Sequence, residues 1–315
     1  KSVDPFPYYV NSRNWERISV NTKEFVRNNI AVVDFFEGQT MPSRDMIESF
    51  DTFVVGSDQV WRDSYGRVES YFCDFAKSTN KKRIAYAASF GLGNWQFDNK
   101  RTEKLKELSK EFQAISVREN DAVGLCKEYL GLEVLNVLDP TLLMEAEDYK
   151  ELIAKADLKP SEGDLIVYFL DKNPRKQEMI KQLEEKRGMK AFTVMPKAVL
   201  GKDTRRCSEA CVYPKVEQWL KGFADSDFVL TDSFHGMVFS IIFEKPFVVV
   251  ANKQRGMSRF VALLSLLGLE DRLILDSEEV NFENISTNID FADAKRRLSE
   301  LKNLSLQFLT SNLEN

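Results

Sequence analysis

Short apolar runs alternate with amphipathic helical patterns along most of the chain. Each run is followed by a polar or glycine-containing turn, which is typical of parallel strands buried on both faces. The runs predict strands over residues 52–55, 83–89, 114–117, 134–137, 165–170, 191–194, 228–231 and 247–250, and a further strand over 30–36. The patterns between them predict helices over residues 99–111, 121–130, 149–156, 174–187, 216–224, 234–243 and 260–267, and a long helix or a helix pair over 288–309. This alternation predicts an α/β fold.

The strand–helix units form two series, separated by a turn-rich segment. This segment, Lys159-Pro-Ser-Glu-Gly-Asp164, has the composition of a linker. We therefore expect two Rossmann-like domains, over residues 1–158 and 159–315, that face each other across a cleft. The C-terminal helix can pack back on the first domain. Because the chain begins at Lys1 without a methionine, we also expect an upstream segment that contains the first strand–helix unit of the first domain.

The stretch from Asp227 to Val250 combines a buried strand, a sharp polar turn, a helix and a second buried strand. His235, the only histidine of the chain, lies in this turn. Open α/β sheets bind ligands at the carboxyl ends of their strands. The start of a helix offers unpaired N–H groups and a partial positive charge, which suit an anion. The stretch therefore predicts an anionic ligand beside one imidazole, with a structural histidine as the alternative.

Composition and charge remove several classes of function. The 315 residues are 43% hydrophobic and 30% charged, with a net charge of -5 and no Lys/Arg-rich block, so no nucleic-acid partner is expected. No apolar run approaches the roughly 20 residues of a membrane span, although peripheral contact with a membrane stays open. Four cysteines are too few for a disulfide framework, which favours the cytoplasm, and with one histidine they are not expected to hold a metal. No turn supplies G-x-G-x-x-G, which argues against a nicotinamide or flavin enzyme.

Five motifs follow one another in register through both halves of the chain. They are Val55-Gly-Ser-Asp-Gln-Val-Trp61, Ala85-Tyr-Ala-Ala-Ser-Phe-Gly91, Ile115-Ser-Val-Arg-Glu119, Val137-Leu-Asp-Pro-Thr141 and Thr231-Asp-Ser-Phe-His-Gly236. Together with Pro246-Phe247 and residues 255–260, they resemble the polysaccharide pyruvyltransferase family over about residues 50–272. Each motif alone is weak, but five in this order are specific. Members usually begin with a strand–turn–helix unit that has an Asn-Tyr-Gly-like turn, which is not found here.

The resemblance implies a transferase. Such enzymes move the carboxyvinyl carbons of phosphoenolpyruvate onto two hydroxyls of a sugar in a surface polysaccharide or its precursor, forming a cyclic ketal and releasing phosphate. It also implies a fold similar to the GT-B glycosyltransferases, with the donor on the C-terminal domain and a glycan or lipid-linked sugar on the N-terminal one. Phosphoenolpyruvate is the donor substrate, and no cofactor or metal is implied. The enzyme would act in the cytoplasm, at the inner face of the membrane for a lipid-linked acceptor. The acceptor sugar, the hydroxyl pair, the ketal stereochemistry and the oligomeric state stay open.

Carried over onto this sequence, the resemblance gives His235 the catalytic role, as acid or as base. The expected donor-binding residues are Arg118, Ser233, Phe234, Gly236, Arg255 and Arg259. Many members have an arginine where this chain has Ser233, and a hydroxyl binds an anion without neutralising it. Arg255 or Arg259 can compensate for that missing charge.

A second group of residues is expected to bind the acceptor or to line the cleft. Its members are Gly56, Ser57, Asp58, Gln59, Trp61, Ser89 and Gly91. Structural alternatives remain beside these roles: an ion pair with a local acid for Arg118, a turn cap for Asp58, and core packing for Trp61. Ser89 and Gly91 suit a tight turn. Asp232 is expected either to cap the helix or to orient His235.

Two alternative functions also remain. The first is a GT-B-type glycosyltransferase that uses a sugar nucleotide, against which the missing nucleotide signature counts mildly. The second is a non-catalytic protein that binds a glycan or an anion, descended from an enzyme whose donor arginine has become Ser233.

Overall fold

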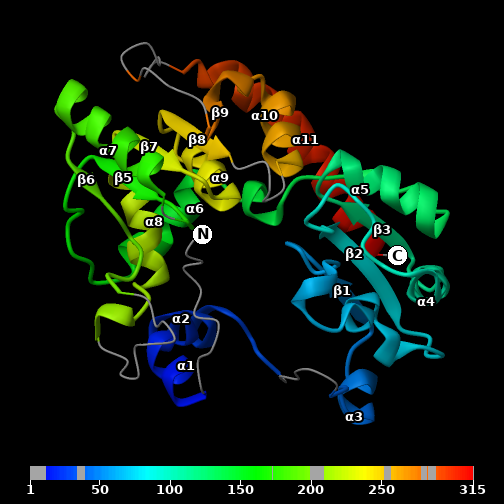
Figure 1. The fold of residues 1–315 in the computed structure, drawn as a ribbon. Coiled ribbons are helices and arrows are strands. Elements are labelled where there is room, and N and C mark those ends of the chain that lie inside the picture. Colours follow the sequence, from blue (N-terminus) through cyan, green and yellow to red (C-terminus); the bar gives the residue numbers. More distant parts are fainter. Residues whose placement is uncertain are drawn as a thin grey trace. The chain divides into compact units, whose positions relative to one another are not determined.

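The computed structural model describes residues 12–33, 40–171, 173–198, 209–251, 257–277, 282 and 289–314. They form two compact units, each with a parallel sheet (Figure 1). The β1–β4 unit comprises residues 33–143, 253–270 and 292–315, and the β5–β9 unit comprises residues 1–32, 144–252 and 271–291. The predicted α/β fold with two Rossmann-like sheets is confirmed.

The sheet of the β1–β4 unit has the order β1-β2-β3-β4, and all its strands are parallel. Its strands are β1 (Thr52–Val55), β2 (Lys82–Ala88), β3 (Ala114–Val117) and β4 (Leu135–Asn136). Its longer helices are α4 (Asn99–Ser109), α5 (Asn120–Leu125), α10 (Ser258–Leu267) and α11 (Phe291–Leu313), and α3 (Arg44–Glu48) is a single turn. A π-helical turn, Cys126–Leu130, extends α5, and Gly131 ends it with a positive φ of 71°. The strand predicted at 134–137 is confirmed but is shorter, because β4 comprises only Leu135–Asn136.

The sheet of the β5–β9 unit has the order β6-β5-β7-β8-β9, again all parallel. Its strands are β5 (Leu165–Tyr168), β6 (Ala191–Phe192), β7 (Phe228–Thr231), β8 (Phe247–Ala251) and β9 (Leu273–Leu275). Its helices are α1 (Ser12–Ile18), α2 (Val20–Asn29), α6 (Ala146–Ala154), α7 (Pro174–Arg187), α8 (Val216–Asp225) and α9 (Phe234–Ile242). Helix α9 packs on β7 and β8. Because all its described side chains except His235 are buried, α9 belongs to the core of this unit.

The boundary between the two units does not lie at the linker that the sequence suggests. Residues 144–158 lie in the β5–β9 unit, where the ring of Tyr149 packs 4.9 Å from that of Phe239 on α9. Most of α11 lies in the β1–β4 unit, where Phe308 packs 6.2 Å from Tyr86 and the Ser305 hydroxyl accepts a hydrogen bond from Leu138 N at 3.0 Å. The packing of helices on each sheet, and not the linker, therefore determines which residues belong to each unit.

The predicted strand at 30–36 is wrong for the part that the structure describes. Residues 30–33 form no strand, and residues 34–36 lie outside the described ranges. Ile30, Val32 and Val33 are each more than half exposed. A β-branched run forms a strand only where a neighbouring strand accepts its hydrogen bonds, and this run has no partner in the two described sheets.

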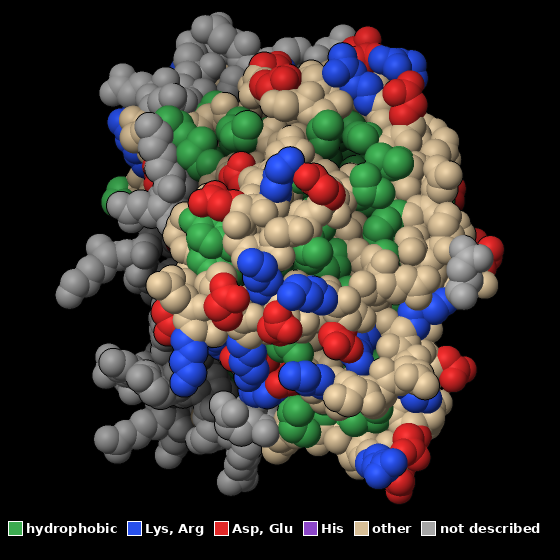
Figure 2. Space-filling view, turned by 90° about the vertical axis from the view of Figure 1, so that its right-hand side faces the viewer, with side chains coloured by type: hydrophobic (Ala, Val, Ile, Leu, Met, Phe, Trp, Pro, Cys, Tyr) green, Lys and Arg blue, Asp and Glu red, His purple; other side chains and the backbone are tan. Residues whose placement is uncertain are grey.

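The described surface carries charges of both signs. Figure 2 shows Lys and Arg side chains interspersed with Asp and Glu side chains over the face that it presents. Among the described residues, no helix combines the length and hydrophobicity that crossing a bilayer requires. Cys73 and Cys126 are buried, and burial raises the pKa of each thiol to about 12. Both are therefore protonated at neutral pH and weak nucleophiles.

Candidate functional site

The carboxyl ends of β1 to β4 bring together a set of charged and polar side chains, which we call the Arg118 cluster. Its members are Asp58, Ser89, Arg118, Glu119, Asp139 and Arg259. The first five come from the turns that directly follow the four strands, and Arg259 comes from the first turn of α10. Parallel strands place their carboxyl ends at one edge of a sheet, which explains how residues so distant in sequence meet.

Arg118 is the centre of this cluster. Its side chain is only 2% exposed; Nη1 donates to Asp139 Oδ2 at 2.6 Å, and Nη2 donates to Asp58 Oδ1 at 3.0 Å. Burial lowers the pKa of Arg118, but the carboxylates of Asp139, Glu119 and Asp58 outweigh it and raise the pKa above its ordinary value. Arg118 is therefore a permanently charged, fixed guanidinium.

Asp58 differs from the other two acids of the cluster because its side chain is 56% exposed. Arg259 Nη1 also lies 3.8 Å from Asp58 Oδ1, so both arginines converge on one carboxylate oxygen. Asp58 adopts a positive φ of 49° in the turn after β1, and its backbone carbonyl accepts a hydrogen bond from Ser89 N at 3.0 Å. The predicted turn role and a site role are thus compatible for this residue.

Glu119 was not among the predicted site residues, although it belongs to the Arg118 motif. Oε1 accepts the Ser89 hydroxyl at 2.7 Å, and Oε2 lies 3.9 Å from Arg118 Nε. Burial raises the pKa of Glu119 above its ordinary value, against the opposing effect of Arg118 and Ser89. The sequence signal was its position next to Arg118 at the end of a strand.

The remaining residues expected to line the site have structural contacts of their own. Ser89 accepts a hydrogen bond from Gly91 N at 3.0 Å, which closes the turn after β2. Gly91 has φ 74°, a backbone conformation that favours glycine, and a Cβ there would also displace the Gln59 side chain, whose Oε1 lies 2.2 Å from that position. Gln59 also accepts a bond from Arg62 Nη1 at 2.6 Å. Gly56, which is exposed, and half-buried Ser57 follow β1 and are joined by a cis peptide bond.

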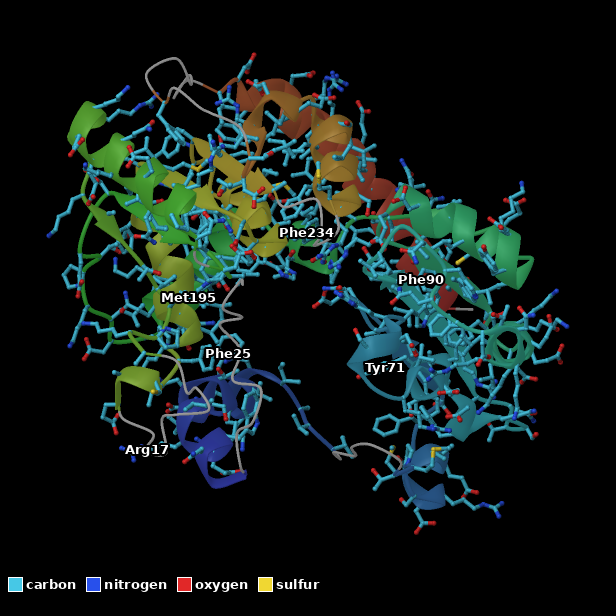
Figure 3. The ribbon with its side chains drawn as sticks, in the orientation of Figure 1. Arg17, Phe25, Tyr71, Phe90, Met195 and Phe234 are labelled. Carbon is cyan, nitrogen blue, oxygen red and sulfur yellow. The ribbon has the colours of Figure 1, made fainter. Side chains whose placement is uncertain are left out.

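Trp61 requires a correction. It is fully buried, its ring stacks on Phe72 at 4.7 Å, and its Nε1 donates to Tyr71 O at 3.1 Å. Phe90, labelled in Figure 3, packs on the same indole at 5.2 Å. A ring enclosed in this way does not reach a sugar, so Trp61 belongs to the core.

In the β5–β9 unit, the turn from Thr231 to Gly236, which we call the His235 turn, joins β7 to α9. Ser233 is the N-cap of α9; its hydroxyl accepts a hydrogen bond from Gly236 N at 3.4 Å, and its own N–H donates to Thr231 Oγ1 at 3.0 Å. His235 is half-buried in the first turn of α9, with its ring 5.5 Å from that of Phe234. Phe234, also labelled in Figure 3, is 6% exposed.

Two residues of the His235 turn, Asp232 and Gly236, have structural roles that the sequence alone did not decide. Asp232 does not cap α9, since Ser233 does; its carboxylate accepts bonds from Leu170 N at 2.6 Å and Asp171 N at 3.2 Å. Gly236 allows α9 to approach β7, because a Cβ there would lie 2.2 Å from Thr231 Oγ1. Arg255, one of the expected donor-binding residues, lies outside the described residues.

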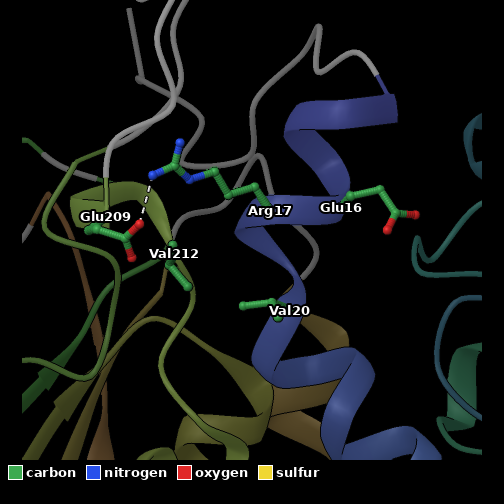
Figure 4. A pocket seen from close by; sticks show the side chains of 5 residues that line it. All are labelled: Glu16, Arg17, Val20, Glu209 and Val212. Atoms are coloured by element: carbon green, nitrogen blue, oxygen red, sulfur yellow. Dashed lines mark hydrogen bonds and ion pairs between the residues drawn. The ribbon is translucent and has the colours of Figure 1, made fainter.

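A pocket elsewhere in the β5–β9 unit involves none of the predicted residues (Figure 4). It is lined by Glu16, Arg17, Val20, Glu209 and Val212. Arg17 Nη2 donates to Glu209 Oε1 at 2.7 Å, but both side chains are more than half exposed. Such a pair contributes little to stability, and nothing in this lining points to a ligand.

The fold and these turns define the class of the protein: a two-unit parallel α/β protein whose polar and charged groups gather at the carboxyl ends of its strands. The model of the polysaccharide pyruvyl transferase family matches residues 3–254, which include both the Arg118 motif and the His235 turn. The chain belongs to this family. No curated protein sequence matches it.

Solved structures that resemble this chain include glycosyltransferases. The chain is 12% identical to a glycosyltransferase from Rickettsia africae ESF-5, with a TM-score of 0.43 over 93% of this chain and 86% of that one. The glycotransferase of kitacinnamycin is 12% identical to this chain, with a TM-score of 0.41 over 92% of this chain and 86% of that one. Arabidopsis thaliana UGT89C1 is 11% identical to this chain, with a TM-score of 0.38 over 79% of this chain. This chain spans only 66% of the length of that protein. Likenesses this distant carry no argument about function.

Proposed function

We propose that the protein transfers a pyruvyl group from phosphoenolpyruvate to two hydroxyls of a sugar in a surface polysaccharide or its precursor. The observation that carries this proposal is the family match over residues 3–254. The proposal places the reaction in the cytoplasm, at the inner face of the membrane where the acceptor is lipid-linked.

The atoms balance in two additions at the same carbon of the donor. One sugar hydroxyl oxygen bonds to C2 of the enol, while C3 takes up a proton and becomes a methyl group. The second hydroxyl oxygen then displaces phosphate from C2, which closes the ketal. The two hydroxyl protons balance the new methyl hydrogen and the proton on the leaving phosphate. No oxidant or reductant is required.

His235 is the residue that we propose to move one of these protons. An imidazole titrates near neutral pH and can either protonate C3 or take the proton of the attacking hydroxyl. His235 is half-buried at the start of α9, so its ring combines contact with solvent and a fixed place in the fold. The proposal leaves both proton-transfer roles possible.

The anionic groups of the donor need cationic or N–H partners. Arg118 and Arg259 already converge on a carboxylate, that of Asp58, which supports a role for this pair in binding a carboxylate or phosphate. Within the β5–β9 unit, the first turn of α9 with the Ser233 hydroxyl is a separate candidate anion site that we propose from the sequence and the helix start. Arg255 stays an expected partner of an anion from the sequence. Ser57, Asp58 and Gln59 remain the proposed contacts for the acceptor hydroxyls.

A ligand screen separates this proposal from its two alternatives. A ligand that binds only the native state stabilises it by about 2.7 kcal/mol at a concentration of about one hundred times its Kd. We expect phosphoenolpyruvate to raise the Tm more than UDP or CMP does. A larger shift with a nucleotide would favour a glycosyltransferase. Binding of glycans without release of phosphate from phosphoenolpyruvate would favour a non-catalytic protein.

A further inference from the structure

A fully buried lysine lies close to the His235 turn in the hydrogen-bond network of the β5–β9 unit. Lys176, in the first turn of α7, is 0% exposed, and its Nζ contacts Asp171 and Asp232, the latter at 2.5 Å. The side chains of Asp171 and Asp232 are 4% and 5% exposed. We call these three residues the Lys176 cluster. They carry one positive charge against two carboxyl groups, all away from water.

The cluster joins the carboxyl ends of two neighbouring strands. Asp171 follows β5 and Asp232 follows β7, and these strands pair in register up to Tyr168 and Thr231. The Asp232 carboxylate accepts bonds from two backbone N–H groups that follow β5, those of Leu170 and Asp171. A second link lies beside it, because Thr231 Oγ1 donates to Tyr168 O at 2.8 Å.

The same links continue into the His235 turn. Thr231 Oγ1 accepts the N–H of Ser233 at 3.0 Å, and Ser233 is the cap from which α9 starts. Asp232 lies between Thr231 and Ser233 in the chain, so its side chain fixes the backbone from which the turn begins. His235 is three residues further on. A shift of Asp232 would therefore displace the start of α9 and its imidazole.

Stability alone does not explain such a cluster. Taking three charged groups out of water is costly, and replacing buried ion pairs by apolar side chains of similar volume is often neutral or stabilising. Burial raises the pKa of the Asp232 carboxyl, and Lys176 opposes this. Lys176 Nζ also lies 5.0 Å from the centre of the Phe169 ring, which adds a cation–π contact.

We propose that the Lys176 cluster is a positioning device for His235. This inference rests on the proposed function in so far as His235 acts in the transfer reaction, but the placement of the imidazole is testable without any reaction. Lys176 and Asp171 are positioning residues, since they act through Asp232 and the His235 turn.

The test uses the single histidine of the chain as its own reporter. Since no other imidazole is present in the sequence, the ring nitrogen NMR chemical shifts belong to His235 without further assignment. We expect Asp232→Asn, which removes the charge that holds Lys176, to change these shifts. Arg83→Met is the matched control, because Arg83 is also a buried cation, 1% exposed and paired with Glu111 at 2.9 Å, but lies in the other unit. It should lower the Tm and leave the shifts of His235 unchanged.

Asp171→Asn is the second variant, because it keeps Asp232 and its two backbone hydrogen bonds. We expect a smaller change of the His235 shifts than in Asp232→Asn. Shifts equal to those of the wild type in both folded variants would overturn the proposal. Failure of both variants to fold would also contradict it, since the cluster would then serve the fold rather than the turn.

Turnover gives a separate readout. If the proposed reaction holds, Asp232→Asn should lower kcat by about tenfold or more, because a displacement of about 1 Å can cost about a hundredfold. The KM for phosphoenolpyruvate should change much less. A wild-type protein without transferase activity would refute the proposed function, yet the NMR result would still decide the positioning role.

Discussion

Single residues: Asp58 occupies the place between two arginines that an anionic ligand would need. It holds Arg118 at 3.0 Å and Arg259 at 3.8 Å, although its own side chain is more exposed than either guanidinium. This geometry makes the carboxylate of Asp58 a competitor of any bound carboxylate or phosphate. The contact is intramolecular, so its removal should be measurable as a gain in affinity for an anion.

We predict that Asp58→Asn lowers the Kd for inorganic phosphate by about threefold to tenfold, since tenfold corresponds to only about 1.4 kcal/mol. Asparagine keeps the size of the side chain but removes the negative charge that faces Arg118 and Arg259. Isothermal titration of phosphate checks this. Asp63→Asn, which removes the acid paired with Arg101 in the same unit, is the control and should leave the Kd unchanged. An unchanged or higher Kd in Asp58→Asn would argue against the arginine pair as an anion site.

Glu119 makes stability depend on pH in a defined direction. Burial raises its folded-state pKa above the ordinary value, so the folded state holds more protons than the unfolded state between the two pKa values. The contribution of Glu119 to stability is therefore fully present below its pKa in the unfolded state. It is lost as the pH rises through its pKa in the folded state. Glu119→Gln removes this titration. We expect the free energy of unfolding of the wild type, relative to Glu119→Gln, to fall from about pH 4 towards neutral pH. Urea unfolding across this range measures it, and a difference that rises with pH would contradict the assignment.

Gly236 is required by close packing. A methyl group there would meet Thr231 Oγ1 at 2.2 Å, and Thr231 is fully buried and bonded to Tyr168 O. We predict that Gly236→Ala lowers the free energy of unfolding by about 1–3 kcal/mol. Gly124→Ala is the control on α5, where nothing lies within 4 Å of the added carbon. It should raise stability by about 0.5–1 kcal/mol, as alanine does in a helix. Equal effects of the two changes would show that Gly236 is not sterically required.

At the level of single residues, the sequence indicates candidate chemistry more readily than it indicates burial. His235 and Arg118 are predicted as site residues because a lone imidazole and a guanidinium follow buried strands, and their roles stay predictions. Trp61 was misplaced because an aromatic residue beside polar turn residues suits either a sugar or the core. Lys176 was missed because it belongs to a highly charged helical segment, in which one lysine with buried partners looks like its exposed neighbours.

Secondary-structure elements: the start of α9 depends on one side chain. Ser233 accepts the N–H of Gly236 and caps a helix whose other described side chains are mostly buried. We predict that Ser233→Ala lowers the free energy of unfolding by about 1 kcal/mol, the usual cost of a lost N-cap. Ser233→Thr keeps the hydroxyl and should retain most of that stability. Thermal unfolding of the two variants measures the difference, and equal losses would show that the hydroxyl does not cap the helix.

Most elements followed from periodicity, and the exceptions have physical reasons. Strands β1, β2, β3, β5, β7 and β8 are short apolar runs that end in polar turns, and the pattern predicted them to within one or two residues. Strand β9 was not predicted, because Leu273–Leu275 is only three residues long and half-buried. The run at 30–36 has the composition of a strand, but composition does not provide a partner strand.

Whole molecule: the boundary between the two units was only partly within reach of the sequence pattern. The turn-rich segment 159–164 does look like a linker, yet residues 144–158 pack with the unit on the other side of it, whereas the packing of the C-terminal helix on the first sheet was expected. Contacts such as those of Tyr149 with Phe239 are long-range and have no local signature. The motif series, by contrast, was sufficient to identify the family, because it is a property of the sequence itself.

The central claim is that this family member transfers a pyruvyl group with His235 as the proton-moving residue. The most direct measurement is phosphate release from phosphoenolpyruvate, followed with a panel of glycan and lipid-linked acceptors, with the ketal detected by NMR. We predict acceptor-dependent release by the wild type and a rate at least about a hundredfold lower for His235→Ala, because general acid–base groups contribute about 10²–10⁴-fold. Release by His235→Ala at the wild-type rate would contradict the claim.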